Sequence, residues 1–437
     1  MISRYESWGR FPRIEQSATL LRWADDAAST LAGSRGATLV FGNGRSYGDS
    51  CLARDGHLLD ARGLDRFLNF DRALGVITCE SGVLIGDILE RVVPEGWFLP
   101  VVPGTQWVTV GGAIANDIHG KNHHHSGTFA HHIESLTLVR SDLDVTECSP
   151  TNHADLFRAT VGGLGLTGVI TSARIRLQKI RSGWMDVERV RFHSLAEFFE
   201  LSAQSAGAWP YTVAWIDCFA PQSQLGRGHF FRGRHTESDS RTLPRRRGSI
   251  DVPFTPPVSV VSTRAMQLFS SAYFHRPFGG TSTACQPYSD FLFALDGIGQ
   301  WNRLYGPSGL QQYQCVLPPD SARAAIGQLL RATKRAGSGS FLAMMKEFGD
   351  QPSLGMLSFA RRGTTLAIDF AAGETSEKLF REFDAIVAEA KGALYPAKDS
   401  RMSGAMFRAG FPGLAAFERF VDPKLASAFW KRAHDDR

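Results

Sequence analysis

Residues 103–132 (PGTQWVTVGGAIANDIHGKNHHHSGTFAHH) limit what this chain can fold into more than any other stretch. They contain five glycines and six of the thirteen histidines of the chain. Glycines at this density let the backbone come close to a flat or charged ligand, because no Cβ stands in the way. Gly111 and Gly112 precede a small apolar run, which predicts a short helix whose first N–H groups are free for a phosphate. A glycine-rich surface loop with solvated histidines remains the alternative.

The histidines of this stretch do not have the spacing of a metal site. His123, His124 and His125 are adjacent in the sequence, so they cannot share one face of a helix as ligands do. Neither a cysteine pair nor an HExxH motif accompanies them. We therefore predict no metal.

Two more glycine clusters lie in the first 180 residues. Residues 37–41 read as a strand that leads into GNGRSYG at 42–48, a loop that can present several N–H groups to an anion. GGLGLTG at 162–168 precedes a strand at 169–177. The loop at 42–48 has neither the GxGxxG spacing of a dinucleotide fingerprint nor the GK[ST] of a P-loop. Together the three clusters predict one large nucleotide cofactor contacted from several sides, although each alone also reads as a turn.

Composition excludes several classes of protein. The 437 residues, 43% of them hydrophobic, suffice for two cores. The net charge of +5 comes without the basic stripe and interleaved aromatics of a nucleic-acid binder. Six cysteines without a CxxC pair predict reduced thiols in a cytoplasmic protein. Neither a signal-peptide core nor an apolar run of 18 residues is present, so we expect any membrane contact to be peripheral.

Periodicity predicts the remaining elements. Residues 15–35 have the spacing of a helix. After about residue 180 the pattern becomes that of a separate α+β unit, and its order of strand, helix, strand, strand and helix over 311–392 predicts an antiparallel sheet covered on one face. Residues 234–257 and 276–300 read as loops, the first of them rich in Arg, Ser and Pro.

Four motifs together resemble the vanillyl-alcohol-oxidase-type (PCMH-type) FAD flavoproteins. They are GNGRSYGDS at 42–50, PGTQWVTVGGAIANDIHGKNHH at 103–124, VGGLGLTGVI at 161–170 and AKDSR at 397–401. The resemblance covers nearly the whole chain, and within that family it is to enzymes that oxidise the 2′-hydroxyl of a polyprenyl-phosphoryl-β-D-ribose in cell-wall precursor biosynthesis. VTVGGAIA combined with IHGKNHH is a specific match, whereas the short WGR and VDP are not.

The resemblance implies an α+β fold with two domains. Residues 1–180 would bind FAD, residues 181–392 would form a substrate domain with an antiparallel sheet, and residues 393–437 would return to the FAD domain. Backbone N–H groups would hold the FAD through charge-assisted hydrogen bonds to its phosphates. The FAD-binding residues that the resemblance implies are Gly42, Asn43, Gly44, Arg45, Ser46, Tyr47, Gly48, Pro103, Gly104, Thr105, Thr109, Gly111, Gly112, Ala115, Asn116, His119, Gly120, Asn122, Gly165, Thr167, Gly168, Ile170 and Lys398.

Arg45 bears on how the cofactor is attached. In several members of the family the residue before the serine of this loop is a histidine bonded covalently to the flavin. Here that position is Arg45, which cannot form such a bond. We therefore expect the FAD to be non-covalent.

Oxidising a secondary alcohol requires hydride loss from carbon and proton loss from oxygen. The resemblance implies Lys398, His119 and Tyr47 as catalytic candidates at the flavin edge. A buried Lys398 with a lowered pKa would assist proton removal, although an exposed Lys398–Asp399 ion pair is the alternative. His119 would bind the sugar or the flavin, unless it is only a satisfied loop histidine. The implied substrate-binding residues are Lys121, Trp215, Gln312, Gln314, Lys346 and Thr365.

Individual substrate-binding candidates have open alternatives. Gln312 and Gln314 alternate along a strand, so they share one face, and one face of that strand would look into the site. Lys121 would bind the substrate phosphate or remain solvated, and Trp215 would serve as a lid or as core.

The strand at 364–370 departs from the family pattern. Close members carry a cysteine next to the flavin and an asparagine two residues before it, whereas this chain has Ala367 and Thr365. Hydride transfer does not need the cysteine, so we expect activity to survive. The pocket is altered, which leaves the identity of the sugar open.

The sequence leaves three functions open. The first is oxidation of a lipid-linked ribose as the first half of an epimerisation to arabinose, which a short-chain reductase partner would complete. In that case VPFTPPVSVV at 252–261 and Arg245 to Arg247 would contact a lipid tail and the inner membrane face. The second is a soluble alditol or aldonolactone oxidase that uses O₂. The third is a flavoprotein without catalytic activity.

Overall fold

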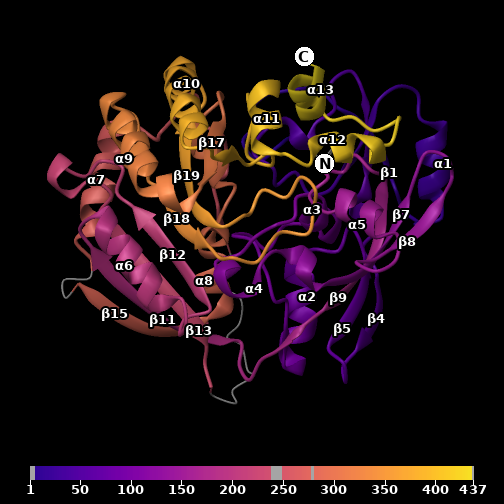
Figure 1. The fold of residues 1–437 in the computed structure, drawn as a ribbon, viewed down its shortest axis with the longest axis horizontal. Coiled ribbons are helices and arrows are strands. Elements are labelled where there is room, and N and C mark those ends of the chain that lie inside the picture. The colour runs from indigo at the N-terminus through magenta and orange to yellow at the C-terminus, as the bar shows by residue number, and fades with distance from the viewer. Residues whose placement is uncertain (1–4, 238–248, 277–279, 436–437) are drawn as a thin grey trace.

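The computed structural model describes residues 5–237, 249–276 and 280–435. Figure 1 shows two lobes side by side, the first built from the N-terminal part of the chain and the second from its middle. The C-terminal segment crosses back from the second lobe onto the first. This is the two-part α+β architecture that the sequence predicts.

The N-terminal lobe contains a short parallel sheet and a longer antiparallel sheet. Their strand orders are β1-β3-β2 and β4-β5-β9-β7-β8. The strands are β1 (Ser17–Leu20), β2 (Thr38–Phe41), β3 (His57–Asp60), β4 (Phe67–Asp71), β5 (Val76–Glu80), β7 (Ile133–Val139), β8 (Val145–Cys148) and β9 (Val169–Arg176), with a small pair of β6 (Trp97–Phe98) and β10 (Gln178–Lys179). The helices are α1 (Asp26–Gly33), α2 (Ile85–Val92), α3 (Val110–Ala115), α4 (His123–Ser126) and α5 (Ala154–Thr160). Apolar residues of α2, α3, β7 and β9 form one buried cluster in this lobe.

The second lobe is built on an eight-stranded antiparallel sheet of order β15-β11-β13-β12-β18-β19-β17-β20. Its strands are β11 (Trp184–Phe192), β12 (Tyr211–Ile216), β13 (Gly228–His235), β15 (Thr281–Pro287), β17 (Leu310–Leu317), β18 (Ala343–Phe348), β19 (Gly363–Ala371) and β20 (Ala393–Leu394). Helices α6 (Leu195–Ser205), α9 (Pro319–Arg335) and α10 (Glu374–Glu389) pack on one face and bury Phe198, Leu329 and Phe383 against it. The opposite face packs partly against the first lobe, through Met185, Val187 and Tyr211, and its β17, β18 and β19 contribute to a cavity between the lobes.

Shorter elements surround this sheet and end the chain. Near the open face lie β14 (Ile250–Asp251), α7 (Thr263–Phe274), α8 (Tyr288–Leu292) and β16 (Ile298–Gly299). The C-terminal segment forms α11 (Gly404–Gly410), α12 (Leu414–Phe417) and α13 (Ala428–Asp435). Its bridge between Leu425 and Thr38 extends the parallel sheet of the first lobe, so the end of the chain is part of that lobe.

Two predictions of secondary structure are wrong. The helix predicted over 15–35 begins only at Asp26, because residues 17–20 pair with β3 instead. Residues 276–300 are not a loop, since β15 pairs with β11 and α8 follows. The strand β15 is polar and mostly exposed, so it lacks the hydrophobic alternation that marks a strand in a sequence. Of the loop predicted over 234–257, residues 238–248 lie outside the described residues.

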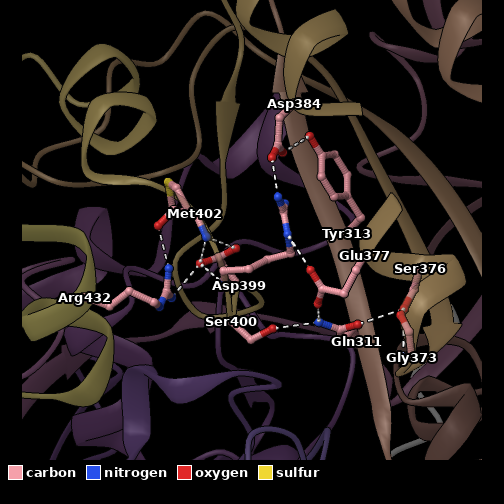
Figure 2. A network of polar contacts seen from close by, with 11 residues as sticks. Gln311, Tyr313, Gly373, Ser376, Glu377, Asp384, Asp399, Ser400, Met402 and Arg432 are labelled. Carbon is pink, nitrogen blue, oxygen red and sulfur yellow. Dashed lines mark hydrogen bonds and ion pairs between the residues drawn. The ribbon is translucent and has the colours of Figure 1, made fainter. Parts of the chain in front are cut away.

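One guanidinium ties the C-terminal segment to the first lobe. Arg432 on α13 lies 2.9 Å from both Asp49 and Asp399, and Figure 2 shows its approach to Asp399. Asp399 also accepts hydrogen bonds from the backbone N–H groups of Arg401 and Met402, at 3.1 and 2.9 Å. Because Asp49 directly follows the first glycine loop, this contact fixes the chain around residue 399 to that loop.

The same segment is attached to the second lobe through Arg401. Its guanidinium contacts Asp384 at 2.6 Å and Glu377 at 3.3 Å, both on α10. Gln311 on β17 donates to Glu377 and Ser400, at 3.0 and 3.1 Å (Figure 2). The chain on either side of Lys398 is therefore held between the two lobes.

We expect Arg432→Ala to destabilise the fold by about 3–5 kcal/mol, because it leaves Asp49 and Asp399 buried without a counter-charge. Thermal or urea unfolding measures the loss. The matched control is Arg335→Ala, which breaks an exposed pair with Glu382 and should cost about 0–1 kcal/mol. Equal losses in both variants would contradict a structural role for the Arg432 contacts.

Candidate active site

A cavity of about 630 Å³ lies where the three glycine clusters meet the open face of the eight-stranded sheet. Its size is that of a site for a large organic ligand. Residues of the first lobe, of β17, β18 and β19, and of the C-terminal segment all contribute to its wall. The site therefore exists only when these separate parts of the chain are assembled.

The first glycine loop is held in place by its neighbours on both sides. The Asn43 side chain donates to the Trp107 carbonyl at 2.8 Å, and the Tyr47 N–H donates to the Ala397 carbonyl at 2.9 Å. A Cβ on Gly48 would lie 1.6 Å from the Asp399 carbonyl oxygen, so only glycine allows the C-terminal segment to approach this closely. The loop and residues 397–399 thus form one wall of the cavity.

Free backbone donors line this wall. Within the described chain, the N–H groups of Asn43, Gly44, Arg45 and Ser46 have no protein acceptor. The short helix α3 differs from the prediction, because its first N–H groups are already used. Those of Val110 and Gly111 donate to the first lobe's own carbonyls, and that of Gly112 donates to Thr109 Oγ1 at 3.2 Å. The anion-binding donors are therefore in the loop and not at the helix N-terminus.

The wall of the cavity also leaves room for a dinucleotide to approach the backbone. Gly104 and Gly165 both line the cavity, and a Cβ added to either would meet no protein atom within 4 Å. Such open backbone, next to free N–H groups, is what close contact with a phosphate-bearing cofactor requires. The residues present therefore fit FAD.

The second lobe supplies a polar wall. Gln312 and Gln314 on β17, Lys346 on β18, and Thr365 and Ala367 on β19 all line the cavity. Alternate residues of a strand point to the same face, so these side chains share the face that the helices leave open. The residues between them, such as Cys315 and Leu366, are buried in the core beneath those helices.

His119 is buried beside this wall. Gln314 donates its amide to His119 Nε2 and to Thr365 Oγ1, at 3.2 Å each. Burial lowers the pKa of His119 well below its usual value, and the charges of Lys346, His123 and Lys398 lower it further. The imidazole is therefore neutral, with its proton on Nδ1, which has no acceptor within the described residues.

Lys398 lines the cavity and forms no ion pair with a carboxylate among the described residues. Its Nζ sits 3.6 Å from the centre of the Tyr47 ring, a cation–π contact. Burial lowers the pKa of the Lys398 ammonium. Asp399 points away and pairs with Arg432, so the two residues are not the exposed ion pair that remained open from the sequence. The pKa of Lys346 is lowered to about 8 by burial.

The structure brings most of the predicted site residues to one cavity. The residues in its lining are Gly42, Asn43, Gly44, Arg45, Ser46, Tyr47, Pro103, Gly104, Thr105, Thr109, Gly111, Gly112, Ala115, Asn116, His119, Gly165, Gly168, Ile170, Lys398, Gln312, Gln314, Lys346 and Thr365. Their roles toward a ligand remain predictions.

Six predicted residues lie behind the lining. They are Gly48, Gly120, Asn122, Thr167, Lys121 and Trp215. Lys121 donates to the Leu292 carbonyl at 2.8 Å, with its pKa lowered to about 7 by burial, so it is not the solvated lysine of the alternative. Trp215 is buried and donates to the Phe341 carbonyl at 2.9 Å, which is the position of a core residue. Asn122 donates to the Pro100 carbonyl at 2.7 Å.

Sequence reasoning missed several lining residues. Trp8 lies under the Arg45 guanidinium, 4.5 Å from its ring centre, and it belongs to the short WGR motif, which alone is too unspecific to indicate a site residue. Asp296 lines the cavity and accepts from the Gln106 N–H at 2.9 Å, but it lies in the stretch that was read as loop. Tyr395 stands two residues before the AKDSR motif.

These features define an FAD-binding oxidoreductase of two lobes, and comparison with known proteins agrees. The FAD binding domain family matches residues 15–149. Decaprenylphosphoryl-β-D-ribose oxidase of Mycolicibacterium smegmatis is 31% identical, with 96% of this chain and 94% of that protein aligned. Mouse L-gulonolactone oxidase is 32% identical over 31% of each chain.

The chain therefore belongs to the FAD-dependent oxidoreductase family of decaprenylphosphoryl-β-D-ribose oxidase. Its similarity to that enzyme runs through both lobes, whereas the similarity to the mouse lactone oxidase is confined to about a third of the chain. Among the described residues, none of the helices is long and apolar enough to cross a membrane.

We expect the flavin to leave the protein on acid precipitation, because Arg45 stands where a covalent histidine link would be formed. The measurement is the absorbance of the supernatant and of the pellet after trichloroacetic acid treatment. Flavin in the supernatant supports the prediction, and a yellow pellet that resists washing would contradict it.

Proposed function

We propose that this enzyme oxidises the 2′-hydroxyl of a polyprenyl-phosphoryl-β-D-ribose to the ketone. One observation carries the proposal. Two half-buried lysines, Lys346 and Lys398, line the cavity beside the neutral His119, and neither forms an ion pair with a carboxylate among the described residues. Such a pocket suits a guest that carries both hydroxyl groups and a phosphate. The similarity over 96% of the chain to an oxidase of that substrate supports the choice of guest.

The residues divide the work of the reaction. FAD, when bound, supplies the hydride acceptor. The C–H electron pair leaves the substrate as hydride, the hydroxyl proton moves to the Lys398 amine, and the C=O bond forms. Burial lowers the pKa of Lys398 and so increases the fraction of free amine that can take this proton. Gln314, held by His119 and Thr365, would orient the sugar, and Lys346 would pair with the phosphate.

Lys398→Met should slow anaerobic flavin reduction by the lipid-phosphoryl ribose about 10²–10⁴-fold, the usual contribution of a positioned acid or base. Stopped-flow absorbance of the flavin measures the rate. Lys378→Met, which removes an exposed lysine on α10, is the matched control and should keep the wild-type rate. Full activity in Lys398→Met would contradict the assigned role.

A soluble alditol or aldonolactone oxidase is the second candidate. The similarity of about a third of the chain to L-gulonolactone oxidase favours it. The same anaerobic experiment separates the two, since free alditols and lactones would then reduce the flavin and re-oxidation in air would release peroxide. Reduction by the lipid-linked ribose alone supports the first proposal.

The ketone product implies a reductase partner. Oxidation alone removes the configuration at the 2′ carbon, and only a second enzyme that delivers hydride to the opposite face completes an epimerisation to arabinose. A short-chain reductase has this chemistry, and it is the class of partner that we propose.

We further propose peripheral contact with the inner face of the membrane. Ile298 and Asp251 line the cavity, and around this side lie exposed apolar residues, of which Ile250 is 79%, Leu268 74% and Phe254 66% exposed. An apolar surface beside a cavity mouth suits a guest with a lipid tail. Arg245 to Arg247, expected to meet anionic headgroups, lie outside the described residues.

The double variant Phe254→Ser/Leu268→Ser should weaken binding to phosphatidylglycerol vesicles about 30-fold, since each exposed apolar side chain contributes on the order of 1 kcal/mol when buried. Vesicle co-sedimentation is the measurement. Leu74→Ser, at an equally exposed leucine on the turn between β4 and β5, is the control. Unchanged binding of the double variant would count against this surface.

A further inference from the structure

Asp369 is a buried carboxylate on the cavity side of the sheet. It follows Thr365 and Ala367 at intervals of two along β19, and both of those residues line the cavity, so its side chain shares their face. Only 1% of its surface is exposed. The strand register places it opposite Gln312, which donates to Asp369 Oδ1 at 2.5 Å. Gln312 thus stands between this carboxylate and the cavity.

The second oxygen of the carboxylate has no donor. Asp369 Oδ2 is buried, and none of the described residues donates a hydrogen bond to it. A buried acceptor without a partner costs about 1–3 kcal/mol, and more when it is charged. An unsatisfied buried group in a folded protein calls for an explanation, and one explanation is a role in catalysis.

The charge of Asp369 acts on Lys398. Asp369 raises the pKa of Lys398, whereas burial and the charge of Lys346 lower it. Burial raises the pKa of Asp369, while the hydrogen bond from Gln312 and the charge of Lys398 act against this rise. The two do not form a direct ion pair among the described contacts, because the ammonium lies on the Tyr47 ring. The other titratable groups that face this pair are Lys346, His119, Tyr47, Arg45 and Tyr305.

We propose that Asp369 is a positioning residue that acts through Gln312 and through space to supply the counter-charge for Lys398 once it has accepted the substrate proton. The proton passes from the substrate hydroxyl to Lys398 Nζ, which becomes an ammonium ion, and this positive charge favours the unprotonated form of Asp369. This inference rests on the proposed alcohol oxidation for its use, but the electrostatic link between the two residues exists without substrate.

The first test is a titration of Lys398 in the flavin-loaded protein. The chain has only nine lysines, so [ε-¹³C]lysine labelling gives few signals, and Lys398→Arg identifies the signal of interest. Asp369→Asn keeps the shape and an acceptor for Gln312 but removes the charge. Asp369→Asn should lower the titration midpoint of Lys398 by about one pH unit or more, because a nearby opposite charge usually shifts a pKa by about that much and the variant removes it. Asp369→Glu should restore most of the shift.

Glu347→Gln is the matched control. Glu347 is a half-buried carboxylate of the same sheet, with its pKa raised by burial, and it accepts a hydrogen bond from Thr364 at 2.6 Å. It faces away from Lys398 and should leave that midpoint unchanged. If Asp369→Asn does not fold, Asp369→Ser removes the same charge and gives the same test.

The second test is the pH dependence of anaerobic flavin reduction. Removing the negative charge makes Lys398 lose its proton at lower pH, so the acid limb of the profile should move to lower pH in Asp369→Asn, in step with the titration. If Asp369→Asn reacts more slowly but neither the titration of Lys398 nor the acid limb of the pH profile shifts, Asp369 has only a structural role and the proposal is overturned. A shifted titration without reduction by the lipid-phosphoryl ribose would uphold the role of Asp369 and reject the proposed substrate.

Discussion

The contact of Arg432 with Asp49 and Asp399 is the interaction on which the site depends most. Both carboxylates are buried, and a buried carboxylate without a partner destabilises a fold by several kcal/mol. Sharing one guanidinium between them therefore joins the end of the chain to the first glycine loop. Lys398 has no regular element of its own to hold it. Its place on the Tyr47 ring follows from the contacts of its neighbours on either side.

The cavity gains its chemistry from charges that are not paired at close range. Lys346 and Lys398 are half-buried and form no ion pair with a carboxylate in the described part of the chain, and their charges add to the effect of burial that lowers the pKa of His119. The first glycine loop adds N–H groups without acceptors. Such a wall is costly in the absence of ligands, and phosphate groups and hydroxyls offset that cost when they bind. The same features that weaken the empty protein thus favour a phosphate-bearing cofactor and a phosphate-bearing sugar.

The sequence predicted those parts of the site that depend on local pattern. The glycine clusters, the shared face of Gln312 and Gln314, and the motif around Lys398 are all short-range features. It did not predict the pairing of Gln312 with Asp369, because that contact depends on the register between β17 and β19. The sequence also did not predict that the first N–H groups of α3 are already hydrogen-bonded, because their acceptors lie in a different part of the lobe. The eight-stranded sheet was anticipated only in part, as its polar edge strand β15 has little hydrophobic pattern.

The wall made from residues 42–47 and 397–398 joins positions some 350 residues apart in the sequence. During synthesis the glycine loops leave the ribosome long before the segment that completes them. A nascent chain can therefore fold the sheets of its first lobe early, but it cannot enclose the isoalloxazine ring until translation has passed Arg432. Binding of the flavin is consequently a late step in the synthesis of each molecule, because it requires the segment from residue 397 to Arg432.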